Sequence, residues 1–247
     1  MPLRIAVIGG GVSASTFVYG LRHALRDGRA SVSLFEIGRG PGGRAATRTT
    51  RDVPGLRLDH GTPGFLASEA RTVALCDALC RVGALGLAAH GYGTLRADGS
   101  WEEEAAVPHG GRRYVGGGRG LAGASDALLR GGDPAAAPLA DCRYGHVVRD
   151  VLPRPGGGWV LTGTASGAEE GFVFEADWVV ASTATVAHGR WTETFGGTPP
   201  LWGAAEALCD SEAGRTATGE GGSGRGRRGG AGGSGGGGGG EGVGDGG

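Results

Sequence analysis

The sequence contains no lysine, asparagine or glutamine, so all 24 of its basic side chains are arginine. The absence of lysine excludes Schiff-base chemistry and a lysine general base. The 24 basic residues face 25 acidic ones, for a net charge of −1. This balance creates no overall field that would draw the chain to nucleic acid or anionic lipid, so neither is an expected partner.

Cysteines and long apolar runs are also scarce. The four cysteines show neither paired C-x-x-C spacing nor a secreted disulfide framework, which indicates a reducing compartment, the cytoplasm. Because no further cysteine or histidine accompanies Cys76 and Cys80, we expect them to pack in a core and bind no metal. No apolar run approaches the roughly 20 residues of a membrane-spanning helix. A strand-like segment follows Met1 and Pro2 directly, so we expect no signal or transit peptide.

Glycine is abundant and unevenly distributed, since 20 of the 57 glycines lie among residues 214–247. This segment has almost no apolar side chains to bury, so we expect it to be disordered. Arg225, Arg227 and Arg228 within it resemble an arginine–glycine RNA-binding tract. Three charges offer few phosphate contacts, and no aromatic residue is interleaved for base stacking. We therefore favour a plain flexible terminus over a nucleic-acid-binding tail.

The first 36 residues read as a strand, a helix and a second strand. An apolar run over residues 3–8 is followed by three glycines, a helical pattern over 12–26 and a strand-like run over 31–36. This order predicts a βαβ unit whose two strands are parallel and adjacent.

The glycines of this unit carry the first functional signal, Gly9-x-Gly11-x-x-Ala14. Gly9 permits a tight turn, Gly11 lets the backbone approach a pyrophosphate, and Ala14 keeps the helix close to the sheet. Glu36 lies 27 residues beyond Gly9, a little further than the usual 20 or so, and could accept both ribose hydroxyls. We favour dinucleotide binding over the alternative, a glycine turn in a generic parallel α/β protein.

Two further signals follow the βαβ unit. Glycines in the segment 39–44 allow close backbone contact with a planar or phosphate-bearing ligand, and its arginines can neutralise one; the alternative is a flexible basic loop. Asp59 and His60 could hydrogen-bond the polar edge of a cofactor, although a turn with a surface histidine explains them equally well.

The remaining chain alternates between helical and strand-like patterns. We expect helices over 69–82, 121–130 and 201–208, and a hairpin over 92–107 around Asp98 and Gly99. Segments 146–152, 158–164 and 171–174 read as small antiparallel strands, and residues 177–182 as a buried strand that closes this group.

Together these motifs resemble the renalase-type, amine-oxidase-like flavoproteins. The resemblance rests on the fingerprint, on Glu36, and on the segments G-R-G-P-G-G-R-A-A-T-R (38–48) and L-D-H-G-T-P-G-F (58–65), and continues more weakly over most of residues 3–190. It implies non-covalent FAD in a glutathione-reductase-type fold. It also implies an oxidoreductase that accepts a hydride from a small-molecule substrate onto the flavin, with NAD(P)H as one candidate substrate.

The resemblance also implies roles for individual residues but names no catalytic one. Gly9, Gly11 and Ala14 would hold the pyrophosphate, and Glu36 the adenosine ribose. Gly61 would approach the isoalloxazine, and Val148, or Val147 beside it, would meet the adenine through its backbone. The pyrophosphate and flavin side would be lined by Arg39, Gly42, Gly43 and Arg44.

The expected fold is α/β, with an FAD/NAD(P)-binding Rossmann-like (glutathione-reductase-type) domain, a partial α+β substrate domain and a disordered glycine-rich tail. The Rossmann-like domain would comprise residues 1–65 and 136–185, the substrate domain 66–135 and 186–213, and the tail 214–247. Related enzymes continue further, so we expect a C-terminally truncated chain. Many of them also place a lysine near the flavin, which this chain lacks. Its function would be that of an FAD-dependent oxidoreductase or, alternatively, of an inactive dinucleotide-binding remnant without turnover. A third reading, an RNA-associated protein, rests only on the three arginines of the tail.

Overall fold

The computed structural model describes residues 1–50, 52–88, 93–103 and 111–207. The chain divides into two compact units, Met1–Cys209 and Asp210–Gly247. The second unit, and with it the predicted disordered tail over 214–247, lies outside the described residues.

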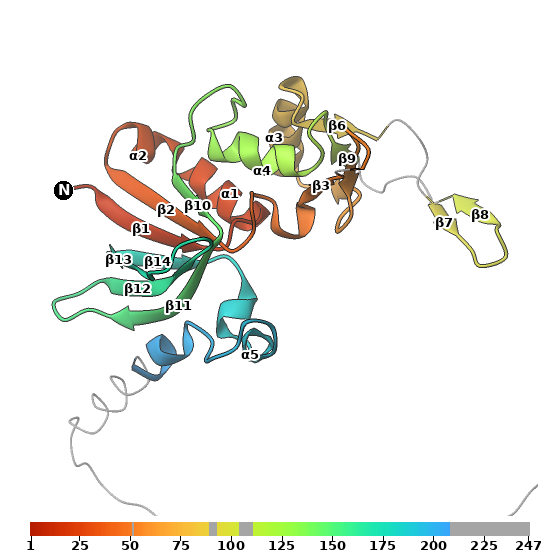
Figure 1. The fold of residues 1–247 in the computed structure, drawn as a ribbon. Helices are drawn as coiled ribbons and strands as arrows, with labels where there is room; N and C mark the ends of the chain where they lie inside the picture. Colours follow the sequence, from red (N-terminus) through yellow and green to blue (C-terminus); the bar gives the residue numbers. More distant parts are fainter. Residues whose placement is uncertain (51, 89–92, 104–110, 208–247) are drawn as a thin grey trace, which may run out of the picture. The chain divides into compact units, whose positions relative to one another are not determined.

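A four-stranded parallel sheet forms the centre of the first unit (Figure 1), with the strand order β10-β2-β1-β14. Strands β1 and β2 pair in parallel from Leu3 opposite Ala30 to Ile8 opposite Phe35, which confirms the predicted βαβ unit. The sheet establishes the predicted α/β class with a Rossmann-like domain. Its strands are β1 (Leu3–Ile8), β2 (Ala30–Glu36), β10 (Asp141–Tyr144) and β14 (Trp178–Ala181).

Helices cover one face of this sheet. The predicted single helix over 12–26 is in fact two, because the chain turns at Leu21, whose N–H is shared between the carbonyls of Phe17 and Val18. Gly20, a poor helix former, immediately precedes the break. Ile5, Val7 and Leu34 face these helices and form one buried core with them. The helices on this face are α1 (Val12–Gly20), α2 (Arg22–Arg26) and α4 (Ala122–Leu129).

An antiparallel sheet covers the opposite face, as Figure 1 shows. Ala6, Ile8 and Phe35 face it, and the Phe35 ring stacks on that of Phe172 with 5.1 Å between centroids. The three predicted antiparallel strands are confirmed as β11 (His146–Pro153), β12 (Trp159–Ala165) and β13 (Phe172–Ala176). The short helices η3 (Ala184–Ala187) and α5 (Arg190–Phe195) and a helical stretch over 202–207 follow.

The segment 177–182 does not close the antiparallel group as predicted. It forms β14, which pairs in parallel with β1 at the edge of the central sheet. The prediction of a buried strand was also wrong, because Trp178 and Ala181 are exposed. The Asp177 carboxylate accepts a hydrogen bond from the Arg4 backbone N–H at 2.8 Å, which fixes this edge position.

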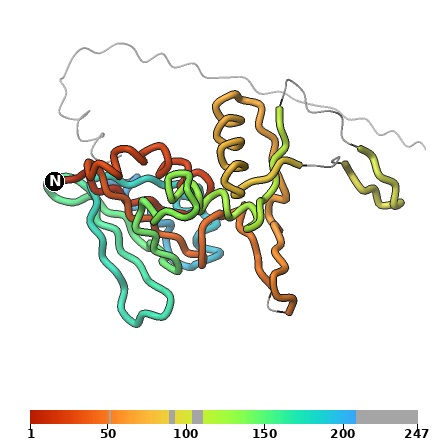
Figure 2. Tube along the Cα trace, turned by 90° about the horizontal axis from the view of Figure 1, so that it is seen from above, coloured from red at the N-terminus to blue at the C-terminus, as the bar shows by residue number. Residues whose placement is uncertain are grey.

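A separate group of elements surrounds α3 (Ala70–Arg81), which the sequence predicted. Glu69 caps the helix by accepting bonds from the amides of Arg71 and Thr72. Cys76 and Leu79 are buried against Tyr114, so core packing of the cysteine pair is confirmed. Helix α3, in gold in Figure 2, packs with a three-stranded antiparallel sheet. The strands of this sheet are, in order, β5 (Phe65–Ala67), β9 (Arg112–Gly116) and β6 (Leu85–Leu87).

Two short hairpins and a 3-10 turn complete the described chain. Strands β3 (Thr47–Thr49) and β4 (Arg57–Asp59) form a hairpin directly after the 3-10 turn η1 (Gly43–Ala45). Strands β7 (Gly93–Leu95) and β8 (Trp101–Glu103) form the hairpin predicted around Asp98 and Gly99; the predicted ends at 92 and 104–107 lie outside the described residues.

Candidate dinucleotide-binding site

The fingerprint turn joins β1 to α1 in a form that requires glycine. Gly9 has φ +98°, a conformation that side chains rarely adopt, and a Cβ there would lie 2.8 Å from the Ser182 Oγ. The Gly9 N–H donates to the Phe35 carbonyl at 2.8 Å. The turn is therefore held between the ends of β2 and β14, at the carboxyl edge of the sheet.

The N-terminus of α1 opens at this edge. Helix α1 begins after Gly11 without a side-chain cap, and a Cβ on Gly11 would meet no atom within 4 Å. Val12 and Ser13 are exposed, whereas Ala14 is completely buried against the sheet. An uncapped helix N-terminus with open space beside it presents N–H groups and positive potential to an anion.

Glu36 ends β2 and turns back onto the fingerprint. One carboxylate oxygen accepts a hydrogen bond from the Gly10 N–H at 2.5 Å, and the other from the Gly38 N–H at 2.6 Å. The side chain thus lies beside the glycine turn. From this position it could accept hydrogen bonds from a ribose, as predicted.

The second glycine loop packs directly on the fingerprint. The Gly42 N–H donates to the Gly10 carbonyl at 2.8 Å, and a Cβ on Gly43 would lie 3.1 Å from the Gly11 Cα. Both loop glycines have positive φ, +123° and +56°. The structure therefore brings together two motifs that are 30 residues apart in the sequence, and only glycine permits the contact.

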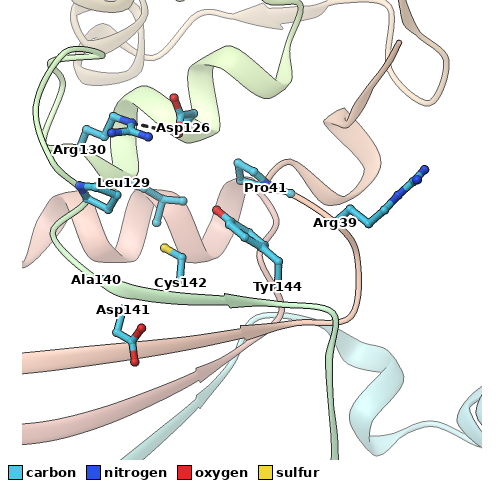
Figure 3. A pocket seen from close by; sticks show the side chains of 11 residues that line it. Arg39, Pro41, Asp126, Leu129, Arg130, Ala140, Asp141, Cys142 and Tyr144 are labelled. Atoms are coloured by element: carbon cyan, nitrogen blue, oxygen red, sulfur yellow. Dashed lines mark hydrogen bonds and ion pairs between the residues drawn. The ribbon is translucent and has the colours of Figure 1, made fainter. Parts of the chain in front are cut away.

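The arginines of this loop point to solvent. Arg39 and Arg44 are exposed, and within the described chain neither makes a hydrogen bond or an ion pair. Arg39 borders a pocket of about 380 Å³ between the loop, α4 and β10, where its guanidinium points away from the other lining groups (Figure 3). Both guanidinium groups are available to an anionic ligand.

Tyr144 and Cys142 line the same pocket from β10, and Tyr144 is the register partner of Glu36. Burial is the main cause that raises the pKa of the Tyr144 phenol, and the neighbouring Cys142 raises it further. Burial likewise raises the pKa of the Cys142 thiol. Both groups are therefore neutral at pH 7, so Cys142 is no thiolate nucleophile.

The residues of the third sequence signal, 59–61, have different surroundings. A Cβ on Gly61 would clash with the Arg44 carbonyl oxygen, so Gly61 lies against the second glycine loop. The Asp59 carboxylate is engaged with Thr47 and the first turn of α4, and His60 is exposed. The turn interpretation fits these residues better than direct contact of Asp59 with a cofactor.

Val148 is distant from the glycine motifs in the sequence, and it packs in a different part of the fold. Its side chain is buried in the core beneath the sheet, beside Ala6 and Phe35. Only its backbone could contact a ligand, and β11 is an edge strand of its sheet. The predicted adenine contact stays a prediction.

Sequence reasoning missed several contacts in this region. Ser182 donates to the carbonyls of Ile8 and Gly9 at 3.1 and 3.0 Å, and Thr183 packs beside it. Gly10 and Gly38 supply the amides that hold Glu36. The signal for Ser182 was its place at the end of a strand, since the ends of parallel strands meet at one edge.

Comparison with known proteins supports the Rossmann-like reading. Residues 7–79 match the model of the NAD(P)-binding Rossmann-like domain. A search of curated proteins found no match. In the described part of the chain, no helix is long and apolar enough to cross a membrane, and no three His, Cys, Asp or Glu side chains group as a metal site would require.

Several solved structures are similar to this chain at low sequence identity. A protein from Exiguobacterium sp. 255-15 described as a protoporphyrinogen oxidase aligns with a TM-score of 0.50 and 13% identity, over 78% of this chain and 61% of that one. Putrescine oxidase (A394C mutant) aligns at 0.48 and 13%, over 77% and 60%. A CLA-producing fatty acid isomerase from P. acnes aligns at 0.48 and 11%, over 75% and 60%. The chain spans about three fifths of the length of these proteins.

Proposed function

We propose that this chain binds FAD non-covalently and that the bound flavin serves an oxidoreductase accepting a hydride from a small-molecule substrate. The observation that carries the proposal is the contact between the two glycine motifs, Gly10 and Gly11 on one side and Gly42 and Gly43 on the other. A simple nicotinamide-binding domain does not require the second motif.

The residues present fit such a group. The open space beside Gly11 and the uncapped start of α1 suit a diphosphate, and the exposed Arg39 and Arg44 can neutralise it. Glu36 would accept hydrogen bonds from the adenosine ribose, and its negative charge would disfavour a 2′-phosphate. Gly61, which lies against the Arg44 carbonyl, would present no side chain on the flavin side. The backbone of Val148 would contact the adenine.

Bound FAD would supply the hydride-accepting chemistry, while the chain supplies binding, orientation and electrostatics. The resemblance to renalase-type, amine-oxidase-like proteins supports small amines and NAD(P)H as candidate substrates, and the likeness to the Exiguobacterium protein supports the fold. The cysteines of the described chain, Cys76, Cys80 and Cys142, are free thiols, which agrees with a reducing compartment such as the cytoplasm.

Dinucleotide binding without turnover is the second candidate. It is favoured by the engagement of Asp59 in a structural contact with Thr47 and the start of α4. This candidate shares the binding site but lacks substrate chemistry.

One experiment on the purified full chain separates these candidates. Titration with FAD, followed by quenching of flavin fluorescence, is expected to show stoichiometric binding at micromolar concentration. Anaerobic addition of an amine or of NADH should then bleach the flavin absorbance. Binding without bleaching would leave the second candidate, and absence of any FAD binding would refute the proposal.

A further inference from the structure

The Asp59 carboxylate caps helix α4 at Leu121, which lies 62 residues later and immediately precedes the helix. One oxygen accepts hydrogen bonds from the Thr47 hydroxyl at 2.5 Å and from the Leu121 N–H at 3.0 Å, and the other lies 3.1 Å from the same N–H. The Thr47 hydroxyl oxygen in turn accepts from the Ala122 N–H at 3.1 Å. Helix α4 has no side-chain cap of its own, so β3 and β4 satisfy two of its orphan amides.

Two glycines approach this carboxylate closely. A Cβ on Gly116 would lie 2.5 Å from one Asp59 oxygen, and a Cβ on Gly120 would lie 2.7 Å from the other. The turn before α4 therefore approaches so closely that only glycine fits. Both Asp59 oxygens are engaged by donors of the protein itself, Thr47 and Leu121, so we assign Asp59 a role that acts through the protein.

The contact continues to the second glycine loop. Thr47 is the register partner of Asp59, and it lies two residues beyond Ala45, the end of η1. Gly61, two residues beyond Asp59, has no space between itself and the Arg44 carbonyl. At its other end, the loop is bonded to the fingerprint through Gly42 and Gly10. The loop is thus fixed at one end to α1 and at the other to α4, and α1 and α4 pack together.

We infer that Asp59 and Thr47 position the second glycine loop against the fingerprint and thereby set the affinity for the flavin half of the dinucleotide. The adenosine half depends instead on Glu36 and the fingerprint turn. This inference rests on the proposed function, because it concerns the wall that would face the flavin side of FAD. Asp59 is a positioning residue, since it contacts Thr47 and the start of α4 and acts on the loop through them.

The first test compares the affinities for FAD and AMP in Asp59→Asn. The amide retains the helix contact partly but weakens it, so we expect FAD to bind about tenfold more weakly and AMP to bind within twofold of wild type. Thr47→Val, which removes only the hydroxyl, should show the same split. Asp52→Asn, at an exposed position between β3 and β4, is the matched control and should change neither affinity. Equal losses for both ligands, or no loss, would overturn the inference.

The second test needs no cofactor. Amide hydrogen exchange at Gly42, bonded to the Gly10 carbonyl, and at Ala45, bonded to the Gly42 carbonyl, reports how firmly the loop is held. Both should exchange at least about tenfold faster in Asp59→Asn, with β1 unchanged. Unchanged exchange at both positions would overturn the inference. A wild-type chain that binds neither FAD nor AMP would refute the proposed function, and exchange would still decide whether Asp59 holds the loop.

Discussion

The carboxylate of Glu36 accepts a hydrogen bond from the N–H of Gly10, 26 residues earlier in the chain, at 2.5 Å. Its second oxygen holds the N–H of Gly38 at 2.6 Å. One side chain therefore joins the fingerprint turn to the start of the second glycine loop. The acid proposed to meet the ribose also shapes the backbone that would meet the phosphates.

Replacing Glu36 by glutamine should disturb both roles. The amide oxygen can replace one carboxylate oxygen, but the NH₂ group would oppose a backbone N–H, donor against donor. Because hydrogen bonds to charged groups contribute about 1.5–3 kcal/mol, we expect AMP and FAD to bind roughly 10- to 100-fold more weakly. Calorimetric titration measures this. Glu103→Gln, on the exposed surface of β8, is the control, and equal affinities in the two variants would contradict the assigned role.

The contact between the glycine motifs leads to a paired prediction. In Gly43→Ala the new Cβ would lie 3.1 Å from the Gly11 Cα at a backbone with φ +56°. We expect a loss of about 1–2 kcal/mol in unfolding free energy from the left-handed conformation, together with weaker FAD binding. Gly40→Ala, in the same loop, meets no atom within 4 Å and should stay within about 0.5 kcal/mol of wild type. Urea unfolding compares them, and similar effects of both would exclude the left-handed conformation and the close contact of Gly43 as the cause.

Local patterns predicted the part of the site that is contiguous in sequence. The run over 3–8, the glycine turn and the run ending at Glu36 carry both apolar periodicity and turn chemistry, and the parallel pairing of β1 and β2 follows from the handedness of the crossover. The helix between them was predicted too long, because periodicity continues across Leu21 although the backbone turns there.

Contacts between distant segments could not be read from the sequence. Strand β10 has only four residues, Asp141–Tyr144, and its partner β2 lies more than 100 residues earlier, so no local signal marks it. Strand β14 was assigned to its sequence neighbours, whereas Asp177 connects it to Arg4 in β1, which lies 173 residues earlier in the sequence. Asp59 was considered a possible ligand of the cofactor. Its structural role could not be recognised, because its partner Leu121 is 62 residues away in the sequence.

Two fully buried serines should respond oppositely to truncation. The Ser15 hydroxyl donates to the Gly11 carbonyl at 3.1 Å, whereas the Ser125 hydroxyl in α4 has no hydrogen-bond partner among the described residues. Ser15→Ala should therefore cost about 1 kcal/mol, and Ser125→Ala should be neutral or stabilising, because it removes an unsatisfied buried group. Thermal unfolding of both variants measures the difference, and a larger loss for Ser125→Ala would reveal a partner for its hydroxyl.

Tyr114 should make the protein sensitive to alkaline pH. Burial raises the pKa of its phenol to about 12, and the hydrogen bond that it donates to Asp77 at 2.8 Å contributes further. In the unfolded chain the phenol ionises near 10, so between about pH 10 and 12 the unfolded state loses a proton that the folded state keeps. The stabilisation from this group is complete below pH 10 and is lost as the pH rises through about 12.

Tyr114→Phe removes this ionisation. The unfolding free energy of the variant should therefore fall less steeply with pH than that of wild type between about pH 9 and 11.5, the range in which the phenol of the unfolded chain ionises. Urea unfolding at a series of pH values provides the slope. Asp77→Asn is the informative companion, because it keeps the phenol and removes one cause of its raised pKa. Phenolate absorbance in that variant should therefore develop at lower pH than in wild type. An unchanged slope in Tyr114→Phe, or an unchanged titration in Asp77→Asn, would show that burial and the contact with Asp77 do not raise the pKa of Tyr114.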